Sequence, residues 1–304
     1  MAFDGDGSWT ILSAVEQNIK RKIETIGVPL KKWSVSINYG IKTGFNDAFI
    51  ISGEKKDELV AADPNSAEII RPILRGRDIK RYGYTYADLW LISTFPSKHY
   101  NIDDFPAVKH HLLSFGKERL EQTGRKYIID GKEVKARKKT NNAWFETQDS
   151  ISYWDDFSKQ KIVYAETMRV HKNDKSDRFP RFSFLDVETF LDKTCFMITG
   201  EHLLYILPII NSTLIQYHIQ RNIAVLDTGG FLMQKIYVED FPIPPIEEDS
   251  YKALTELASK ILAMRASGED TRSIEELVDL HVYALFNLND EEIQYIEAGR
   301  IGGN

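Results

Sequence analysis

Three short basic segments carry the side chains with the clearest chemical potential. They read KTGFND from Lys42, RGRDIKR from Arg75 and KARKKTNN from Lys135. Lysine and arginine bind phosphate, arginine also pairs bidentately with guanine edges, and asparagine pairs with adenine edges. Glycines in the first two segments permit tight backbone geometry and leave amide groups free to meet an anion. The segments predict nucleic-acid contacts from Lys42, Thr43, Asn46, Arg75, Arg77, Lys80, Arg81, Lys138, Lys139, Asn141 and Asn142.

Each segment also has a purely structural explanation. KTGFND can be a strand-to-strand turn in which Asn46 and Asp47 satisfy their own backbone. Asp78 can form a salt bridge with one basic residue of RGRDIKR, which leaves the others free. Trp144 and Phe145, just beyond the third segment, are of types that more often belong to a core than to a stacking platform. These structural interpretations remain open beside the prediction of nucleic-acid contacts.

A metal-dependent nuclease is a competing interpretation of the same region. Glu133 and Lys135 match the acidic-x-Lys half of such a site, with Asp103 or Asp104 as the upstream acid. The same three-residue pattern also begins at Glu54, Asp78 and Asp130. It is therefore background in a chain of which 28% is charged, and the nuclease is only a third hypothesis.

Other catalytic signatures are missing from the sequence. There is no GxGxxG, GxxxxGK[ST], GxSxG or HExxH motif, and no Asn/Asp-Pro-Pro-aromatic tetrapeptide of an amino-methyltransferase. The lone Cys195 excludes a disulfide framework, fits a reducing cytoplasm and lies in an apolar strand pattern typical of an inert thiol. We expect no catalytic residue, metal or cofactor in this chain.

The charge is divided unevenly along the chain. The 304 residues hold 39 Lys and Arg against 45 Asp and Glu, a formal charge of −6. Residues 239–304 hold 15 acidic and 5 basic residues, or −10, which leaves +4 for residues 1–238. Basic residues cluster at 71–81 and 109–139, and a local field rather than net charge attracts phosphate. The acidic total therefore excludes only a diffuse binder of polyanions.

The elements that must position these segments form an α+β pattern. Apolar periodicity predicts helices over 9–26, 54–62, 106–122 and 203–222, and a short one from the Asp63-Pro64 cap to Pro72. Alternation predicts a strand over 33–38 and a short apolar run predicts one over 48–52; further strand-like segments are 89–94, 161–166, 182–185, 194–199 and 231–238. After PIPPI (242–246) comes a helical tail with capping boxes at Ser273/Glu276 and Asn289/Glu292. The interrupted apolar run 203–215 is too short to cross a membrane, and we expect a cytoplasmic protein.

The order of several segments resembles a known family. GIKTGFNDAFII (40–51), ILRGRDIKRYGY (73–84), RKKTNNAWFETQD (137–149), KIVYAE (161–166) and NSTL (211–214) are similar to the TaqI-like C-terminal specificity domain of type IIG restriction–modification enzymes and related adenine-N6 DNA methyltransferases. The resemblance implies a DNA target-recognition domain that works with a methyltransferase, and sometimes a nuclease, placed upstream. S-adenosylmethionine would then belong to that catalytic domain, which this chain lacks.

The resemblance also implies a division of the chain. Residues 1–30 would form a linking helix, 31–246 a β-rich DNA target-recognition domain with flanking helices, and 247–304 a C-terminal helical spacer or appendix. The leading hypothesis is sequence-specific recognition of double-stranded DNA that orients an adenine methyltransferase or restriction enzyme. The alternative is a protein-interaction module that docks a methyltransferase or other defence subunit and has little DNA affinity, which the acidic tail favours. The polar loop 171–181 is expected to be solvated.

Overall fold

A four-stranded antiparallel sheet forms the centre of the molecule. The computed structural model describes residues 12–170, 178–227 and 229–301. The sheet has the order β12 (Phe182–Leu185), β10 (Lys161–Ala165), β14 (Cys195–Gly200) and β2 (Val35–Tyr39). Neighbouring residues of β10 point to opposite faces, and both faces are buried: Ile162 and Tyr164 join one core, and Val163 joins another. The four strands predicted here are present, with boundaries that differ by at most two residues.

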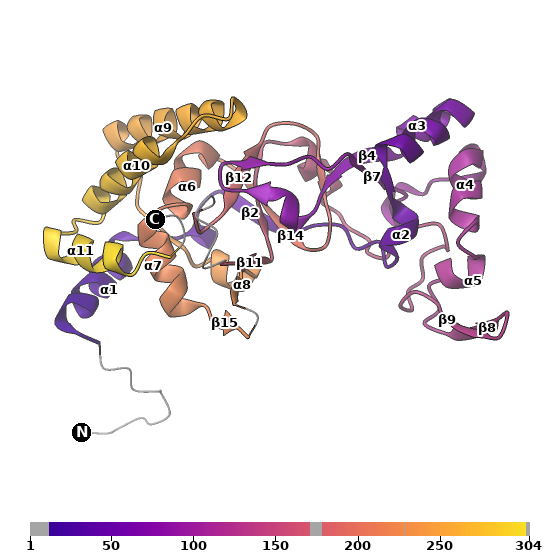
Figure 1. Cartoon of the computed structure of the whole chain (residues 1–304), viewed down its shortest axis with the longest axis horizontal. Helices are drawn as coiled ribbons and strands as arrows, with labels where there is room; N and C mark the ends of the chain where they lie inside the picture. The colour runs from indigo at the N-terminus through magenta and orange to yellow at the C-terminus, as the bar shows by residue number, and fades with distance from the viewer. Residues whose placement is uncertain (1–11, 171–177, 228, 302–304) are drawn as a thin grey trace, which may run out of the picture.

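A helical layer covers one face of this sheet and forms what we call the helix-side core (Figure 1). It contains α1 (Ala14–Ile26), α6 (Leu203–Ile210), α7 (Thr213–Asn222), α9 (Glu248–Ala266), α10 (Arg272–Leu285) and α11 (Asp290–Ala298). Strand β1 (Val28–Pro29) pairs with β17 (Pro242–Ile243) beside them. Both the N-terminal helix and the C-terminal tail contribute buried residues, among them Ile19, Leu254 and Val282. The division at residues 30 and 246 remains a prediction.

The opposite face of the sheet packs on a second core, which we call the distal core. Its mixed sheet has the order β13 (Phe190–Leu191), β4 (Ile70–Leu74), β7 (Leu89–Ile92) and β3 (Ile50–Ser52), with β13 parallel to β4. Helices α2 (Asn46–Phe49), α3 (Gly53–Ala62), α4 (Pro106–Leu113) and α5 (Lys117–Leu120) surround it. The hairpin of β8 (Lys126–Ile129) and β9 (Lys132–Lys135) lies at this end of the molecule (Figure 1).

Short elements connect these layers. Strand β5 (Ile79–Lys80) pairs with β6 (Gly83–Tyr84), and β16 (Gly230–Leu232) lies between β11 (Thr167–Arg169) and β15 (Val225–Leu226). The remaining elements are α8 (Lys235–Val238) and the 3-10 helices η1 (Leu30–Lys32), η2 (Pro64–Glu68), η3 (Gly76–Asp78), η4 (Pro96–Lys98), η5 (Ile102–Asp104) and η6 (Trp154–Ser158). The mixed α+β class with C-terminal helices is confirmed. Within the described ranges, no helix has the length and apolarity needed to span a membrane.

Several predicted boundaries are wrong for local reasons. Asp63 caps a helix as expected, but that helix is the short η2, and Pro72 lies in β4. Ala48 and Phe49 close α2, so the strand predicted over 48–52 begins at Ile50. The helix predicted over 106–122 is interrupted around Gly116, whose φ of +87° favours glycine. The 203–222 helix is interrupted where Ser212 caps α7, and residues 235–238 of the strand predicted over 231–238 form α8.

Of the two capping boxes predicted in the tail, one is present. Asn289 and Glu292 exchange both hydrogen bonds at the start of α11. Helix α10 instead begins at Arg272 after Thr271, so the box predicted at Ser273 and Glu276 is wrong. Residues 9–11 of the first predicted helix and 171–177 of the polar loop lie outside the described residues.

Candidate nucleic-acid interface

The RGRDIKR segment folds into a rigid turn after β4. The carboxylate of Asp78 accepts hydrogen bonds from the backbone N of Arg75 at 3.0 Å, from its Nε at 2.8 Å and from its Nη2 at 2.9 Å. Burial alone would raise the pKa of Asp78, but these hydrogen bonds and the charge of Arg75 lower it. The salt bridge considered from the sequence therefore exists. It fixes Arg75 and leaves Arg77 and Lys80 exposed.

A cleft of about 660 Å³ opens beside this turn. Its wall includes five basic side chains, contributed by three separate parts of the chain: Arg75, Arg77, Lys80, Arg169 and Arg181. Two carboxylates, Glu166 and Asp192, also line it, and Asn46 lies at its wall. The Oδ1 atom of Asp192 accepts a hydrogen bond from the backbone N of Thr194 at 2.9 Å. The cleft therefore combines a basic surface with a few hydrogen-bond acceptors. This arrangement fits a polyanion that also presents hydrogen-bond donors.

Four of the predicted residues meet at this cleft, namely Asn46, Arg75, Arg77 and Lys80. Within the described part of the chain, no hydrogen bond or ion pair engages the side chain of Arg77 or Lys80. Arg169, on β11, was not singled out from the sequence, and Arg181 was noted only as the end of a polar loop. Their basic character alone gave no signal, because both residues are far from the RGRDIKR turn in the sequence and only the fold brings them to the same cleft.

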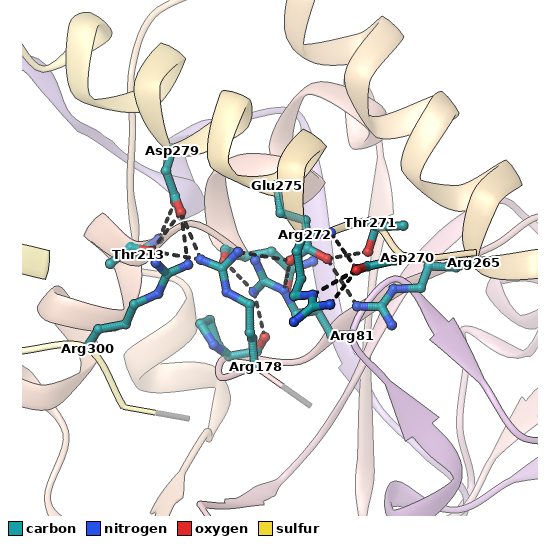
Figure 2. Close-up of polar contacts among 12 residues, drawn as sticks. Arg81, Arg178, Thr213, Arg265, Asp270, Thr271, Arg272, Glu275, Asp279 and Arg300 are labelled. Atoms are coloured by element: carbon teal, nitrogen blue, oxygen red, sulfur yellow. Dashed lines mark hydrogen bonds and ion pairs between the residues drawn. The ribbon is translucent and has the colours of Figure 1, made fainter. Parts of the chain in front are cut away.

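Arg81 has a different position from its neighbours, and its predicted DNA contact needs correction. Its side chain is 1% exposed, and its Nε donates to Glu275 Oε2 at 2.5 Å (Figure 2). Its Nη1 donates to the carbonyl oxygens of Pro180, at 3.0 Å, and Asn211. Since Lys80 is exposed and the next residue turns inward, Arg81 belongs to the interior and is not available to DNA.

The KTGFND loop supports the cleft more than it lines it. Thr43 is 1% exposed, and its hydroxyl donates to Asn46 Oδ1 at 2.6 Å and accepts from the backbone N of Phe45 at 3.1 Å. Thr43 therefore stabilises the turn, and its predicted phosphate contact is corrected. The Oδ1 atom of Asn46 accepts from this hydroxyl, whereas the structural explanation had Asn46 bonding its own backbone. Lys42 lies over the ring of Tyr39 and 3.5 Å from Asp149. The φ of +78° at Gly44 confirms the tight geometry expected there.

Arg137 joins this loop to the third basic segment. The guanidinium is 4% exposed and donates to four carbonyl oxygens, those of Leu120, Thr43, Glu146 and Trp144, at 2.6–2.7 Å. Burial lowers the pKa of Arg137 to about 10. The sequence did not single out this residue, whose role is to hold two loops together.

The third basic segment lies outside the lining of the cleft. Lys138, Lys139 and Asn141 are exposed. The amide of Asn142 donates to the carbonyls of Thr147 at 3.2 Å and Gln148 at 2.9 Å, so its nitrogen is engaged in the fold. The neighbouring Trp144 and Phe145 pack against the distal core, as the structural explanation for them proposed.

Two acidic residues of the nuclease hypothesis form ion pairs with other side chains. Glu133 pairs with Lys126 at 2.9 Å, and Asp103 pairs with Lys109. Among residues 12–170, 178–227 and 229–301, no group of three or more His, Cys, Asp and Glu side chains is placed to hold a metal ion. Cys195 is fully buried, and burial raises the pKa of its thiol well above the ordinary value.

Comparisons with known proteins give a structural likeness without a sequence match. No protein-family model and no curated protein matches this sequence. The type IIL restriction–modification enzyme MmeI, solved in complex with DNA, is 15% identical with a TM-score of 0.60 over 89% of this chain and 36% of MmeI. The type IIG restriction endonuclease BpuSI is 13% identical with a TM-score of 0.49, over 91% of this chain and 33% of BpuSI.

The likeness to MmeI concerns the fold. The chain spans about a third of the length of each of these two enzymes. It shares a fold with part of a restriction–modification enzyme, which supports the expected kind of fold. The narrower resemblance to TaqI-like specificity domains stays a prediction.

Proposed function

We propose that this chain is a non-catalytic module that recognises a specific sequence in double-stranded DNA. It would orient the active site of an adenine methyltransferase, with or without a nuclease, onto a target base. In this proposal a separate catalytic domain or subunit binds S-adenosylmethionine and forms the pocket that receives the flipped adenine. The chain acts in the cytoplasm beside the DNA.

The observation that carries this proposal is the composition of the cleft. Five arginine and lysine side chains line a single cavity together with two carboxylates and an asparagine. Basic groups bind phosphate and set the register of a duplex, while Arg, Asn and carboxylate groups at base edges discriminate sequence. The lining comes from β5, β11 and the residues just before β14, segments that are far apart in the sequence. MmeI, which shares this fold, was solved in complex with DNA.

The rigidity of the cleft wall also supports DNA recognition. Arg75 is held by Asp78 in a bidentate pair, so its guanidinium loses little freedom on binding. Lys80 and Arg81 are adjacent, and the buried anchoring of Arg81 fixes the backbone that carries Lys80 and Arg77. A site on a fixed backbone keeps its charges in register with the phosphates.

A binding experiment on the full chain tests the proposal. Fluorescence anisotropy would measure its affinity for double-stranded DNA selected from a random pool, over a range of salt concentrations. The variant Arg77→Ala/Lys80→Ala is expected to lose at least about tenfold in affinity and to lower the salt slope by about two. The control is Lys252→Ala/Lys260→Ala, which removes two exposed lysines from α9.

Two results would contradict this proposal. One is the absence of DNA binding by the wild-type chain at low salt. The other is an equal loss of affinity in the α9 control, which would show a diffuse charge effect in place of a defined cleft.

The protein-docking function is a second candidate, and one observation favours it. Leu277 and Leu280 on α10 are 48% and 58% exposed and lie on the same side of the helix. Removal of the tail cannot test this idea, because the tail supplies part of the helix-side core. Leu277→Asp/Leu280→Asp leaves the core intact, and loss of capture of a methyltransferase subunit with unchanged DNA affinity would favour docking.

A further inference from the structure

The β8–β9 hairpin carries a feature that the packing of the chain does not explain. Its two strands pair with each other and, within the described residues, with no third strand. Asp130 and Gly131 both have positive φ and form a tight turn at the tip. Next to this turn, Ile128 is 73% exposed, more than any other large hydrophobic residue among those described.

The two faces of the hairpin differ in chemistry. Residues opposite one another share a face, so Tyr127 lies with Val134, and Ile128 lies with Glu133. Tyr127 and Val134 are half-buried, and the Tyr127 hydroxyl donates to Glu121 at 2.9 Å. This inner face holds the hairpin on the protein, and Ile128 is on the outer face.

The surroundings of Ile128 are strongly basic. Lys126 and Lys135 lie opposite each other on the outer face, two residues along each strand from Ile128 and from Glu133. Lys126 pairs with Glu133 at 2.9 Å, but both side chains are more than half exposed, so a phosphate can replace the carboxylate. Residues 125–139 expose six basic side chains, Arg125, Lys126, Lys132, Lys135, Lys138 and Lys139, against Asp130 and Glu133. Such a field favours a polyanion, and it disfavours an apolar or basic protein surface.

The hairpin is also firmly connected to the cleft. Backbone hydrogen bonds from Ala136 to Arg125 and from Gly124 to Arg137 extend the ladder to the base of the hairpin. Arg137 then donates to the carbonyl oxygen of Thr43, in the loop that places Asn46 at the cleft. The hairpin is therefore joined, through the side chain of Arg137, to the loop that carries Asn46.

We propose that this hairpin is a second DNA-binding element in which Ile128 enters a groove and wedges against the bases. Lys126, exchanging its exposed pair with Glu133, and Lys135 beside it contact the phosphates nearest the base of the hairpin, and the apolar side chain partly unstacks one base step. Apolar side chains inserted between base steps kink DNA in this way in minor-groove binders. The inference rests on the proposed DNA-binding function and adds to it a bend in the bound duplex.

Two measurements on the full chain test this inference, one of affinity and one of shape. A duplex with the selected site, labelled at both ends, reports binding by anisotropy and bending by energy transfer. Ile128→Ala is expected to lower affinity about tenfold, as for the loss of one buried apolar side chain, and to reduce the bend without changing the salt slope. Lys126→Ala/Lys135→Ala is expected to lower the salt slope by about two.

Leu280→Ala serves as the matched control, because it shortens a 58% exposed apolar side chain on α10, at the other end of the molecule (Figure 1). It should change neither affinity nor bend. The wedge is overturned if Ile128→Ala keeps wild-type affinity or the wild-type bend while Arg77→Ala/Lys80→Ala loses binding; the proposed function then survives. Loss of capture of a protein subunit by Ile128→Ala, with DNA affinity unchanged, would also overturn it in favour of a protein contact. If the wild-type chain binds no DNA, both proposals fail.

Discussion

Substitution of Glu275 by Gln should cost the protein a large part of its stability. Glu275 lies on α10 with a fully buried carboxylate, and it contacts three arginines and a threonine (Figure 2). Arg81 Nε is 2.5 Å away, Arg265 Nη2 3.1 Å, Arg178 Nη1 3.5 Å and Thr271 Oγ1 2.6 Å. Burial would raise the pKa of Glu275, but the charges of Arg81 and Arg178 and the hydrogen bonds lower it to about 2.

The size of the effect follows from what the substitution leaves behind. Glu275→Gln keeps the shape but removes the charge, so the guanidinium of Arg81 stays buried with a neutral partner. Breaking one side of a buried ion pair typically costs 3–5 kcal/mol, because the remaining charge is uncompensated. Arg178 keeps Asp279 at 2.9 Å, which places the expected loss near the lower end, at about 3 kcal/mol.

Urea unfolding at pH 7 measures this loss directly. The midpoint should fall, the slope should stay constant, and the melting temperature should drop by about 5–10 °C. Asp270→Asn is the control: its pair with Arg272 has side chains 59% and 73% exposed, so its loss should change the free energy of unfolding little. A loss for Glu275→Gln no larger than that of the control would refute the reasoning.

Three further predictions concern buried groups. Burial lowers the pKa of His218 to about 4, so as the pH falls the imidazole of the unfolded chain is protonated before that of the folded protein. Between pH 7 and pH 5 the free energy of unfolding should therefore fall by about 2 kcal/mol. Urea titrations at both pH values would show this fall, and a smaller one in His218→Gln. Buried Cys195, with its raised pKa, should react with a thiol reagent only after unfolding, and rapid stoichiometric labelling of the folded protein would contradict this. Gly40→Ala would place a Cβ 2.0 Å from the carbonyl oxygen of Asp192 and should cost about 1–3 kcal/mol in thermal or urea unfolding. Gly83→Ala, with no atom within 4 Å of its Cβ, should cost almost nothing, and equal losses would disprove the steric explanation.

Local signals in the sequence were sufficient for elements whose partners are near in the chain or whose pattern is periodic. The short apolar runs in residues 161–166 and 194–199 placed two strands of the central sheet, because both faces of each strand meet a core. Asn289 and Glu292 form their capping box through groups three residues apart. The same local logic failed at Ser273, because Thr271 and Glu275 are engaged by a hydrogen bond inside the buried network.

The candidate site was predictable as a composition but not residue by residue. Arg77, Lys80 and Arg81 are equivalent in the sequence, yet only Arg81 is buried, since its partner Glu275 lies 194 positions further along the chain. Thr43 was a predicted phosphate ligand, and Arg137 lies in the third basic segment. Both side chains instead hold loops together. Arg169 reaches the cleft because β11 pairs with β16, and no periodic pattern predicts that pairing.

The buried network also explains why an acidic tail is compatible with a basic cleft. The tail, residues 239–304, carries −10, and without partners such a charge would weaken phosphate binding nearby. Two of its carboxylates, Glu275 and Asp279, are neutralised inside the protein by Arg81 and Arg178 of the body. The body thus uses two arginines to bind its own tail, while Arg77 and Lys80, in the same RGRDIKR segment as Arg81, stay at the surface.

Because Arg81 follows Lys80 directly, loss of the tail's carboxylates should disturb the cleft as well as the core. Glu275→Gln, at a temperature where it remains folded, is therefore expected to weaken DNA binding without changing the salt slope, whereas Asp270→Asn should leave DNA affinity unchanged. Wild-type affinity in folded Glu275→Gln would show that the cleft does not depend on this anchor.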